Sequence, residues 1–229
     1  VSKVYDGNTS MNNVQLNLTN AVAGDGLSIS GVGEYATKNA GINISYSIRQ
    51  LALTGADAAN YYLTSGNQIN NTNGVITPKT VTLSATKTYD GTAALTGNQV
   101  TIGNLVGTET LTFSGATANS KHVAVANKFI NAMTLLDGSN GGLASNYQLP
   151  DITQAVVGVN TVTINAATLT PTLSNTGVTK VYDGNDSAPV GFTPTYTFAG
   201  LVGGDTAAVL SHTNVAYNSA TVAQAHQIT

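Results

Sequence analysis

Apolar and polar residues alternate most clearly in the stretch that begins at Ile42. In this stretch Ile42, Ile44, Tyr46 and Ile48 alternate with Asn43, Ser45, Ser47 and Arg49. Successive side chains of a strand point to opposite faces of a sheet, so this two-residue period predicts a half-buried β-strand. Shorter apolar or alternating stretches predict further strands at residues 14–18, 27–29, 100–102, 111–113, 123–125 and 193–198.

Helical periodicity is nearly missing from the chain. The pattern predicts a single helical turn, near residues 56–60, where Ala-rich residues precede a strand. The stretch 70–74, Asn-Asn-Thr-Asn-Gly, and the Gly-rich and polar insertions at 137–142 and 151–160 are typical of turns and loops. Together these patterns predict an all-β chain.

One five-residue motif, Lys-x-Tyr-Asp-Gly, occurs three times. Its copies are Lys3, Tyr5, Asp6 and Gly7; Lys87, Tyr89, Asp90 and Gly91; and Lys180, Tyr182, Asp183 and Gly184. The tyrosines lie 84 and 93 residues apart (89 − 5 and 182 − 89), a spacing that suits small independent domains. We therefore expect tandem repeats at 1–77, 78–170 and 171–229, the first without its N-terminal strand and the third shortened at its C-terminus.

Other features recur at matched positions. A proline, Pro78 or Pro171, stands eleven residues before the second and third motif tyrosines. An apolar turn with an acid follows each motif, and Asp25 and Glu109 both lie twenty residues past their tyrosine, while the third turn ends in Asp205. The absence of a Gly/Ser linker predicts repeats that abut end to end with limited freedom.

The segments Asn60-Tyr61-Tyr62-Leu63 and Asn146-Tyr147-Gln148-Leu149 resemble the stretch before the second cysteine of immunoglobulin domains. That resemblance implies that Tyr61 and Tyr147 are corner tyrosines, whose hydroxyls bond the backbone upstream. The alternative is a buried tyrosine at the start of a strand. The fold expected is therefore a series of β-sandwich-like, immunoglobulin-like domains, and the alternative is a β-grasp-like mixed unit.

Composition narrows the classes of partner but leaves the redox compartment open. Charged residues make up 8% of the chain, and the net charge of −3 with a pI near 5.4 gives no basic patch for nucleic acid or an anionic membrane. The chain has no Cys, which excludes disulfides and thiolate metal sites. It also has no apolar run of membrane-spanning length and no signal-peptide pattern, so we expect any export signal elsewhere in a longer parent chain.

Catalytic chemistry has no recognisable residue set. His122, His212 and His226 are scattered without acidic partners at metal-ligand spacing, and no nucleophile elbow or phosphate-binding loop occurs. The sequence therefore predicts no enzyme, no catalytic site and no cofactor.

The motif side chains have structural and chemical interpretations. Each Asp is expected to close its turn, with a calcium ligand as the alternative. Each Lys is expected to pack its stem beside the Tyr, and an isopeptide bond to an Asn is the alternative. Each Tyr is expected to pack against its domain and bond through its hydroxyl, with a sugar-stacking platform as the alternative.

The Lys-x-Tyr-Asp-Gly motif, the later Gly-Asp turn, the segment Lys38-Asn39-Ala40-Gly41 and the stretch before Tyr61 together resemble the YDG repeat domain. That domain is found in large secreted bacterial adhesins, the filamentous-haemagglutinin-like exoproteins of two-partner secretion. The resemblance implies an extracellular location on the bacterial cell surface and contacts with other domains of the same chain. It differs from the similarly named methylcytosine-reading domain, whose basic surface is not found here.

The function expected is that of a structural stalk segment that projects a binding region of an adhesin from the cell. The alternative is that the repeats themselves bind a host glycan, a matrix protein or a biofilm polysaccharide. A binder should carry a cluster of exposed aromatic and amide side chains that differs from repeat to repeat, and the insertion after Asp137 is the first place to examine.

Overall fold

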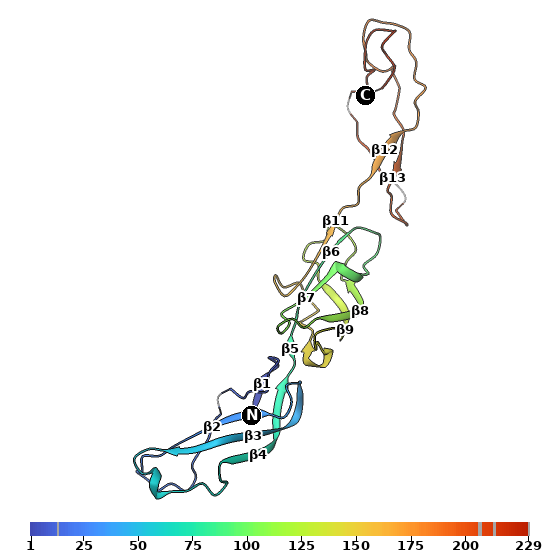
Figure 1. Ribbon diagram of the computed structural model, residues 1–229. Coiled ribbons are helices and arrows are strands. Elements are labelled where there is room, and N and C mark those ends of the chain that lie inside the picture. The colour runs from blue at the N-terminus through green and yellow to red at the C-terminus, as the bar shows by residue number, and fades with distance from the viewer. Residues whose placement is uncertain (13, 206–207, 213, 229) are drawn as a thin grey trace. The chain divides into compact units, whose positions relative to one another are not determined.

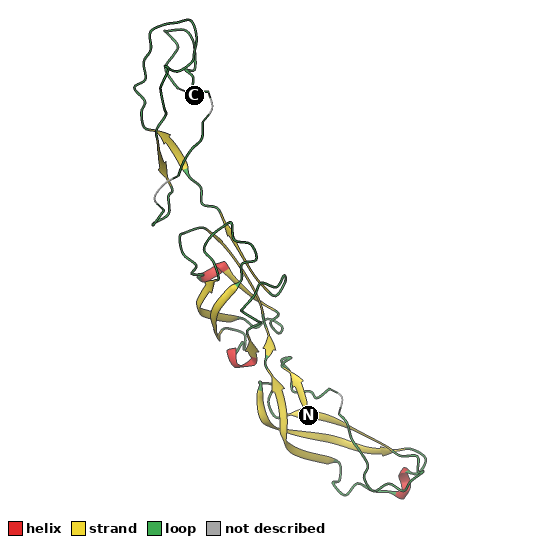
Figure 2. Ribbon diagram, turned by 180° about the vertical axis from the view of Figure 1, so that it is seen from behind, coloured by secondary structure: helices red, strands yellow, loops and turns green. Residues whose placement is uncertain are grey.

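A computed structural model describes residues 1–12, 14–205, 208–212 and 214–228. The chain is all-β: among these residues the regular elements are strands and three short 3₁₀ turns (Figures 1 and 2). It divides into two compact units. The first comprises Val1–Thr86, Ala93–Ser120 and Val125–Thr163, and the second comprises Lys87–Thr92, Lys121–Ala124 and Ile164–Thr229.

The first repeat is built on a four-stranded sheet of order β1-β4-β3-β2 (Figure 1). Its strands are β1 (Ser2–Val4), β2 (Ser28–Tyr35), β3 (Gly41–Thr54) and β4 (Gln68–Thr77), with the 3₁₀ turn η1 (Ala58–Asn60) between β3 and β4. The pairs β2/β3 and β3/β4 are antiparallel with bulges, and β1 runs parallel to the end of β4. This parallel pair brings the first Tyr-Asp-Gly turn to the end of β4.

The second repeat follows with three small sheets. Its elements are β5 (Lys79–Thr80), β6 (Thr82–Thr88), η2 (Gly97–Gln99), β7 (Val100–Gly103), β8 (Leu111–Ala118), β9 (Ile130–Asp137), η3 (Ala144–Asn146), β10 (Tyr147–Gln148) and β11 (Asn160–Asn165). The strands pair as β10-β5, β11-β6-β7 and β8-β9. Only Pro78 separates β4 from β5, so the last strand of one repeat leads directly into the first strand of the next.

The third repeat lies in the second unit. Its strands β12 (Thr170–Leu173) and β13 (Tyr196–Ala199) form an antiparallel pair. Isolated bridges, Ser187 to Ala216 and Tyr217 to Ile228, join the segments that follow.

The buried core lies mostly in the first unit, with Ile164 contributed by the second. Its largest fully buried side chains are Tyr5, Tyr35, Ile76, Val81, Leu83, Ile130, Asn146 and Asn160. The two buried asparagines satisfy their amides; for example, the Asn160 side chain accepts from the Ile130 amide and donates to the Ile130 carbonyl, at 3.0 and 2.9 Å. These bonds offset the cost of burying a polar group among apolar side chains.

Most predicted strands are present. The alternation that begins at Ile42 lies inside β3, where Ile44, Tyr46 and Ile48 are buried while Ile42 is 76% exposed. The stretches 27–29, 100–102, 111–113 and 193–198 overlap β2, β7, β8 and β13. The helical turn predicted near 56–60 is the 3₁₀ turn η1.

Three local predictions were wrong. Residues 14–18 form no strand: Met11 and Val14 instead lie over Gly33 of β2, where the lack of a side chain leaves room for them. Residues 123–125 form a turn rather than a strand, followed by Asn127 at φ +52°. The stretch 70–74, predicted as a turn, lies within β4 because the neighbouring strand β3 supplies its hydrogen-bond partners.

The expected immunoglobulin-like arrangement remains a prediction. Sheets of immunoglobulin sandwiches are antiparallel, whereas β1/β4 and β10/β5 pair in parallel here. Within the described residues, no helix has the length and apolar character needed to cross a bilayer.

Candidate functional site at the ends of the repeats

The first Lys-x-Tyr-Asp-Gly motif folds into a turn held by its own side chains. The Lys3 ammonium lies 2.7 Å from Asp6 Oδ1 and also donates to the Asn8 carbonyl at 2.7 Å. Asp6 Oδ1 accepts from the Asn8 amide at 3.2 Å, so the carboxylate closes the turn. Gly7 has φ +81°, a value that glycine adopts without the steric cost of a Cβ.

The other two motifs repeat this turn. Lys87 pairs with Asp90 at 2.7 Å, and Lys180 pairs with Asp183 at 2.8 Å. Each Asp accepts a backbone amide two residues on, from Thr92 and Asn185, at 3.0 and 3.1 Å. The turn glycines, Gly91 and Gly184, have φ +79° and +81°. The motif therefore encodes one conserved local shape three times within this chain.

The ion pairs set the charge state of the turns. The Lys87 and Lys180 ammonium groups hold the pKa of Asp90 and of Asp183 below the usual value. For Asp6, burial acts to raise the pKa, but the hydrogen bonds from Lys3 and Asn8 outweigh it and the pKa is lowered. The carboxylate oxygen considered for calcium is thus engaged by an ammonium. Among the described residues, no three His, Cys, Asp or Glu side chains cluster as a metal site would require.

An isopeptide bond requires a Lys, an Asn and an acid in contact. Lys3 Nζ lies 3.1 Å from Asn8 Oδ1, and Lys180 Nζ lies 2.9 Å from Asn185 Oδ1, each beside the Asp of its turn. The second turn has Thr92 in the position of Asn8. The three turns thus share the ion pair, not the asparagine.

The side chain of Tyr5, in the first repeat, is buried against residues of the second repeat. Tyr5 is 1% exposed, and its hydroxyl donates to Glu109 Oε1 at 2.6 Å. Tyr147 donates to the other carboxylate oxygen, Oε2, at 2.7 Å. The two rings meet edge to face, with centroids 5.4 Å apart. One carboxylate of the second repeat therefore accepts hydrogen bonds from tyrosines of both repeats.

Residues around this carboxylate extend the contact between the two repeats. Lys38 Nζ of the first repeat lies 3.4 Å from Glu109 Oε1. Asn146, which is fully buried, accepts from the Ala40 amide at 2.8 Å and donates to Asn39 Oδ1 at 3.1 Å. The segment Lys38-Asn39-Ala40 of the first repeat therefore lies against the second repeat together with the Tyr5 turn.

Close packing accompanies the hydrogen bonds. A Cβ added to Gly7 would lie 2.6 Å from Val106 Cγ1, so the missing side chain of Gly7 makes room for this valine. The Val106 amide donates to the Tyr147 hydroxyl at 2.9 Å, and the Glu109 amide donates to the Val106 carbonyl at 3.0 Å. The turn from Val106 to Glu109 is thus held by its own backbone hydrogen bond, by the Tyr147 hydroxyl and by packing against Gly7. We call Val106, Glu109, Asn146 and Tyr147 the socket of the second repeat.

Burial and charge shift the titration of this socket. Burial raises the pKa of Tyr147 to about 12, together with its hydrogen bond to Glu109. Burial and the same carboxylate also raise the pKa of Tyr5. For Glu109, burial acts to raise the pKa, but the donors Tyr5, Tyr147 and Lys38 outweigh it, and the pKa is lowered. At neutral pH Glu109 is therefore a carboxylate, and the phenols of Tyr147 in the socket and of the incoming Tyr5 are neutral.

The second unit contains a corresponding contact. The Tyr89 hydroxyl donates to Asp205 Oδ1 at 3.1 Å, and a Cβ on Gly91 would lie 2.9 Å from Val202 Cγ1. The Tyr89 amide donates to the Asn165 carbonyl, as the Tyr5 amide donates to that of Thr77. Residues Lys87–Thr92 and Lys121–Ala124 of the second repeat group with the third repeat. The second Tyr-Asp-Gly turn therefore engages the repeat that follows it, as the first turn does.

The two predicted corner tyrosines bond the backbone far upstream. Tyr147 accepts from the amide of Val106, and Tyr61 accepts from the amide of Val22 at 3.1 Å, which lie 41 and 39 residues earlier. Both tyrosines also donate to an acid, Glu109 or Asp25. The sequence marked these acids by their matched twenty-residue spacing but assigned them no partner.

The exposure that a sugar-stacking platform requires differs among the motif tyrosines. Tyr5 has no exposed ring to offer, whereas Tyr182 is 65% exposed.

His122, His212 and His226 lie at separate positions, and the His226 amide donates to Asn218. The insertion after Asp137 forms a turn closed by the bond from the Gly138 amide to the Gly142 carbonyl.

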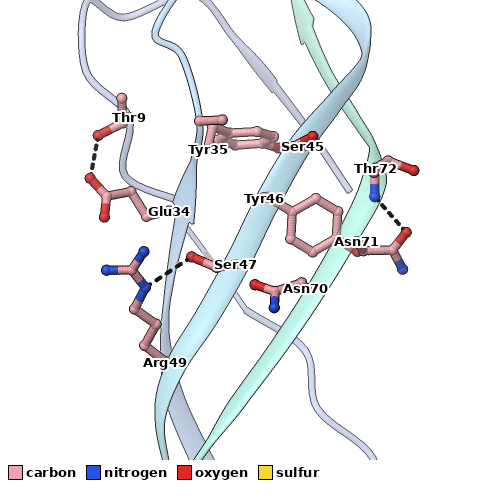
Figure 3. Close-up of a pocket in the computed structure, with 11 residues that line it drawn as sticks. Thr9, Glu34, Tyr35, Ser45, Tyr46, Ser47, Arg49, Asn70, Asn71 and Thr72 are labelled. Carbon is pink, nitrogen blue, oxygen red and sulfur yellow. Dashed lines mark hydrogen bonds between the residues drawn. The ribbon is translucent and has the colours of Figure 1, made fainter.

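A polar groove of about 550 Å³ lies on the first repeat, across β2, β3 and β4 (Figure 3). It is lined by Thr9, Glu34, Tyr35, Ala36, Ser45, Tyr46, Ser47, Arg49, Asn70, Asn71 and Thr72. The Tyr35 hydroxyl is buried and has no hydrogen-bond partner among the described residues. The groove therefore offers amide, hydroxyl and charged groups, while the Tyr35 and Tyr46 rings are largely covered.

Comparison with known proteins agrees with the repeated turn. Residues 1–69 and 72–155, more than half of the chain, match the family model of the YDG domain, and each match contains one Lys-x-Tyr-Asp-Gly turn. No curated protein and no solved structure matches the chain. The chain belongs to the YDG domain family.

Proposed function

We propose that the chain is a structural stalk segment of a bacterial cell-surface or secreted adhesin. Its tandem, sandwich-like repeats would hold a binding region of the parent protein away from the cell. The observation that carries this proposal is the contact of Tyr5 with Glu109 and Tyr147, because it locks two successive repeats together at their covalent junction.

A locked junction is what a spacer requires. Two domains joined by a single residue, here Pro78, can still hinge if nothing else holds them. The buried carboxylate removes that freedom: moving the first repeat away would leave Glu109 Oε1 without its phenol donor and expose the ring of Tyr5. An unsatisfied buried partner costs about 1–3 kcal/mol per hydrogen bond. The network therefore favours one orientation of the first repeat on the second.

The setting of this stalk follows from the resemblance to exoprotein repeats and from the composition. We place it outside the bacterial cell, with other domains of the same chain as its main partners. Sparse charge and a slightly acidic balance argue against nucleic acid and against insertion into a membrane. We assign it no enzymatic activity and no required cofactor, since the repeated residues serve turns and contacts between repeats.

Residual dipolar couplings measured by NMR test the locked junction. In the wild-type protein, one alignment tensor should fit amides of both β3 and β8, because the two strands belong to repeats held in one orientation. Replacing Glu109→Ala should give the two strands different tensors. Asp25→Ala is the matched control, since the Asp25 carboxylate accepts from Tyr61 of its own repeat, and it should preserve a common tensor. Separate tensors in the wild-type protein would contradict the stalk.

Calcium provides the second arm of this experiment. The proposal expects the same couplings with added calcium and with a chelator, because Lys3 and Lys87 already neutralise Asp6 and Asp90. A common tensor that appears only with calcium would move these aspartates from turn residues to metal ligands.

The groove on the first repeat supports a second candidate function, binding of a glycan, matrix protein or biofilm polysaccharide by the repeats themselves. Its amides and hydroxyls offer the hydrogen bonds that sugars use, whereas a groove across β7 and β8 of the second repeat is lined mainly by aliphatic, aromatic and threonine side chains. Binding to a glycan array that is lost on Asn71→Ala and retained on Asn140→Ala would favour this function. Equal binding by both variants would contradict it.

A further inference from the structure

The groove of the second repeat, of about 600 Å³, runs along one edge of strand β8. Every residue from Thr110 to Gly115 lines it. Successive side chains of a strand point to opposite faces, so a lining without gaps means that the groove follows the backbone edge of β8. The opposite wall is aliphatic: Leu95, Val100, Ile102 and Leu105. The groove thus combines a main-chain edge with an apolar wall.

One end of this β8 edge already pairs with another segment. The Ala116 carbonyl accepts from the Leu95 amide at 2.9 Å, and the Ala118 amide donates to the Ala93 carbonyl at 2.8 Å. The rest of the edge has no such partner: within the part of the chain that the structure describes, β9 is the only strand paired with β8. An edge left open in this way presents unpaired N–H and C=O groups to another chain.

The open main-chain groups belong to Leu111 and Phe113, whose side chains are half-buried. The Thr110 amide donates to the carbonyl of Ser139, just after β9, so the main chain of Thr110 bonds toward β9. Alternate residues of an antiparallel strand direct their main-chain groups to opposite sides. Those of Leu111 and Phe113 therefore point into the groove.

The repeats that adjoin the second repeat in the chain contact it elsewhere. The first repeat fills the socket around Glu109, and the third repeat receives the Tyr89 turn. All the lining residues of the groove belong to the second repeat. Leu105 and Thr110 directly flank the socket turn from Val106 to Glu109, so the groove continues the surface of the junction.

The lining determines the chemistry of an occupant. None of the described residues that line the groove carries a charge. A charged side chain placed there would lose its water without gaining a partner, so the groups that enter the groove are uncharged. The open edge of β8 also requires main-chain donors and acceptors at the spacing of a strand. A lipid chain would cover the apolar wall but leave these groups unbonded.

We propose that this groove binds an extended peptide segment of a partner protein, which adds a strand to the open edge of β8. The main chain of the peptide bonds the N–H and C=O groups of Leu111 and Phe113. Its alternate side chains are apolar and face Val100 and Ile102, and the side chains between them face solvent. In this mode of recognition the main chain supplies affinity and the apolar positions supply specificity.

Hydrogen exchange of single amides, measured by NMR on the free protein, tests the open edge. The Leu111 and Phe113 amides should exchange rapidly. The Thr112 and Ser114 amides should exchange slowly, because they bond toward β9. Equal protection of all four amides would overturn the proposal, since the edge would then be closed.

A phage-displayed library selected on the 229-residue protein supplies the probe, with peptides of about eight residues to cover Leu111–Gly115. Selected sequences should carry Val, Ile, Leu or Phe at alternate positions. The bound peptide should slow exchange at Leu111 and Phe113 and leave Thr112 and Ser114 unchanged. N-methylation of the peptide amides that face β8 should abolish binding, whereas N-methylation of the intervening amides should preserve it.

A pair of leucine variants tests the apolar wall. Leu111→Ala should weaken peptide binding about tenfold, because a leucine side chain no longer covers the peptide. Leu136→Ala, at a 42% exposed leucine of β9 outside the groove, is the matched control and should bind as the wild type does. The N-methylated peptides test the same contact in the wild-type protein, so the result does not depend on the folding of a variant.

Failure of the library to yield a binder, binding that tolerates N-methylation at either set of amides, or equal binding by the two leucine variants would overturn the proposal. Self-association of the wild-type protein that protects the Leu111 and Phe113 amides without peptide would assign the edge to a second copy, and would also overturn it. The proposal goes beyond the stalk function and does not rest on it, since the dipolar couplings test the junction separately.

Discussion

The turns at Tyr5 and at Tyr182 have the same internal structure and opposite surroundings. Both hold a Lys–Asp ion pair of 2.7–2.8 Å and a glycine at φ +81°. Tyr5 is nevertheless 1% exposed and Tyr182 is 65% exposed. The motif therefore folds the turn by itself, and the repeat that receives the turn decides whether the tyrosine is buried.

This difference separates two roles within five residues. The Lys, Asp and Gly determine the local conformation, since their contacts are within seven residues of one another. The Tyr contributes to stability only where a carboxylate such as Glu109 accepts its hydroxyl. Paired substitutions at the two turns can therefore separate local folding from the contact between repeats.

The largest effect is expected for Glu109→Ala. It removes the acceptor of two buried phenols, which should lower the free energy of unfolding of the first unit by about 3–4 kcal/mol. Lys38 adds little because its side chain is 43% exposed. The matched change Asp25→Ala removes the acceptor of one phenol and should cost about 1 kcal/mol. Urea denaturation followed by circular dichroism measures both; equal costs would contradict the comparison.

Gly7→Ala should have the next largest effect. A Cβ there adds the strain of a positive φ, about 1–2 kcal/mol, and a collision with Val106. Val is stiff about χ1 and cannot move aside freely, so the collision should add about 1 kcal/mol. Gly184→Ala has the same φ and open space, and should show the strain alone. Subtracting the two unfolding free energies isolates the packing at the contact, and a difference of zero would exclude it.

Tyr5→Phe tests the hydroxyl with the ring retained. The variant leaves Glu109 Oε1 without its phenol donor and should lower the unfolding free energy by about 1.5–2 kcal/mol. The same change at Tyr182 removes an exposed hydroxyl and should stay within about 0.5 kcal/mol of the wild type. Thermal unfolding of both variants provides the measurement. A larger loss at Tyr182 would reverse the roles assigned to the two turns.

The smallest effect is a pH dependence. The pKa of Glu109 is lowered in the folded state, so its contribution is present above the usual value of 4.5 and is lost as pH falls through the folded pKa. The pKa of Tyr147 is raised from 10.0 to about 12, so its contribution is present below pH 10 and is lost as pH rises through about 12.

Glu109→Gln separates this carboxylate from the acids of the turns, which titrate in the same acid range. Unfolding free energies measured from pH 3 to pH 7 should rise less steeply with pH in the variant than in the wild type. Identical slopes would show that Glu109 does not contribute to the acid sensitivity.

The sequence predicted strands well wherever burial follows a regular period. The alternation of Ile44, Tyr46 and Ile48 with polar residues predicted their strand, because every second side chain of a half-buried strand faces the core. Residues 70–74 failed because hydrogen bonds from β3, over twenty residues away, hold Asn-rich backbone in a strand. Residues 14–18 failed because apolar side chains pack on Gly33 without joining a ladder. Neither neighbour can be identified from local propensity.

The candidate site was visible only as spacing. The sequence located the Tyr-Asp-Gly turns, and it placed Asp25 and Glu109 at equal distances from their tyrosines. It did not show that Tyr5 donates to an acid 104 residues away. The sequence of a repeat does not indicate whether a side chain finds its partner in the same repeat or in the next one. Asp25 and Glu109 carry the same charge at the same spacing, so the sequence did not distinguish Glu109, which accepts from two tyrosines, from Asp25, which accepts from one.

The single carboxylate shared by Tyr5 and Tyr147 also bears on cooperativity. The second repeat completes its core partly with the Tyr5 ring of the first repeat, so the stability of the second repeat depends on whether the first is folded. Arrays with such coupling behave as one-dimensional systems of nearest-neighbour terms. In a series of YDG repeats, a substitution at one glutamate would shorten the stretch that unfolds as a unit, and the two sides of the defect would melt independently.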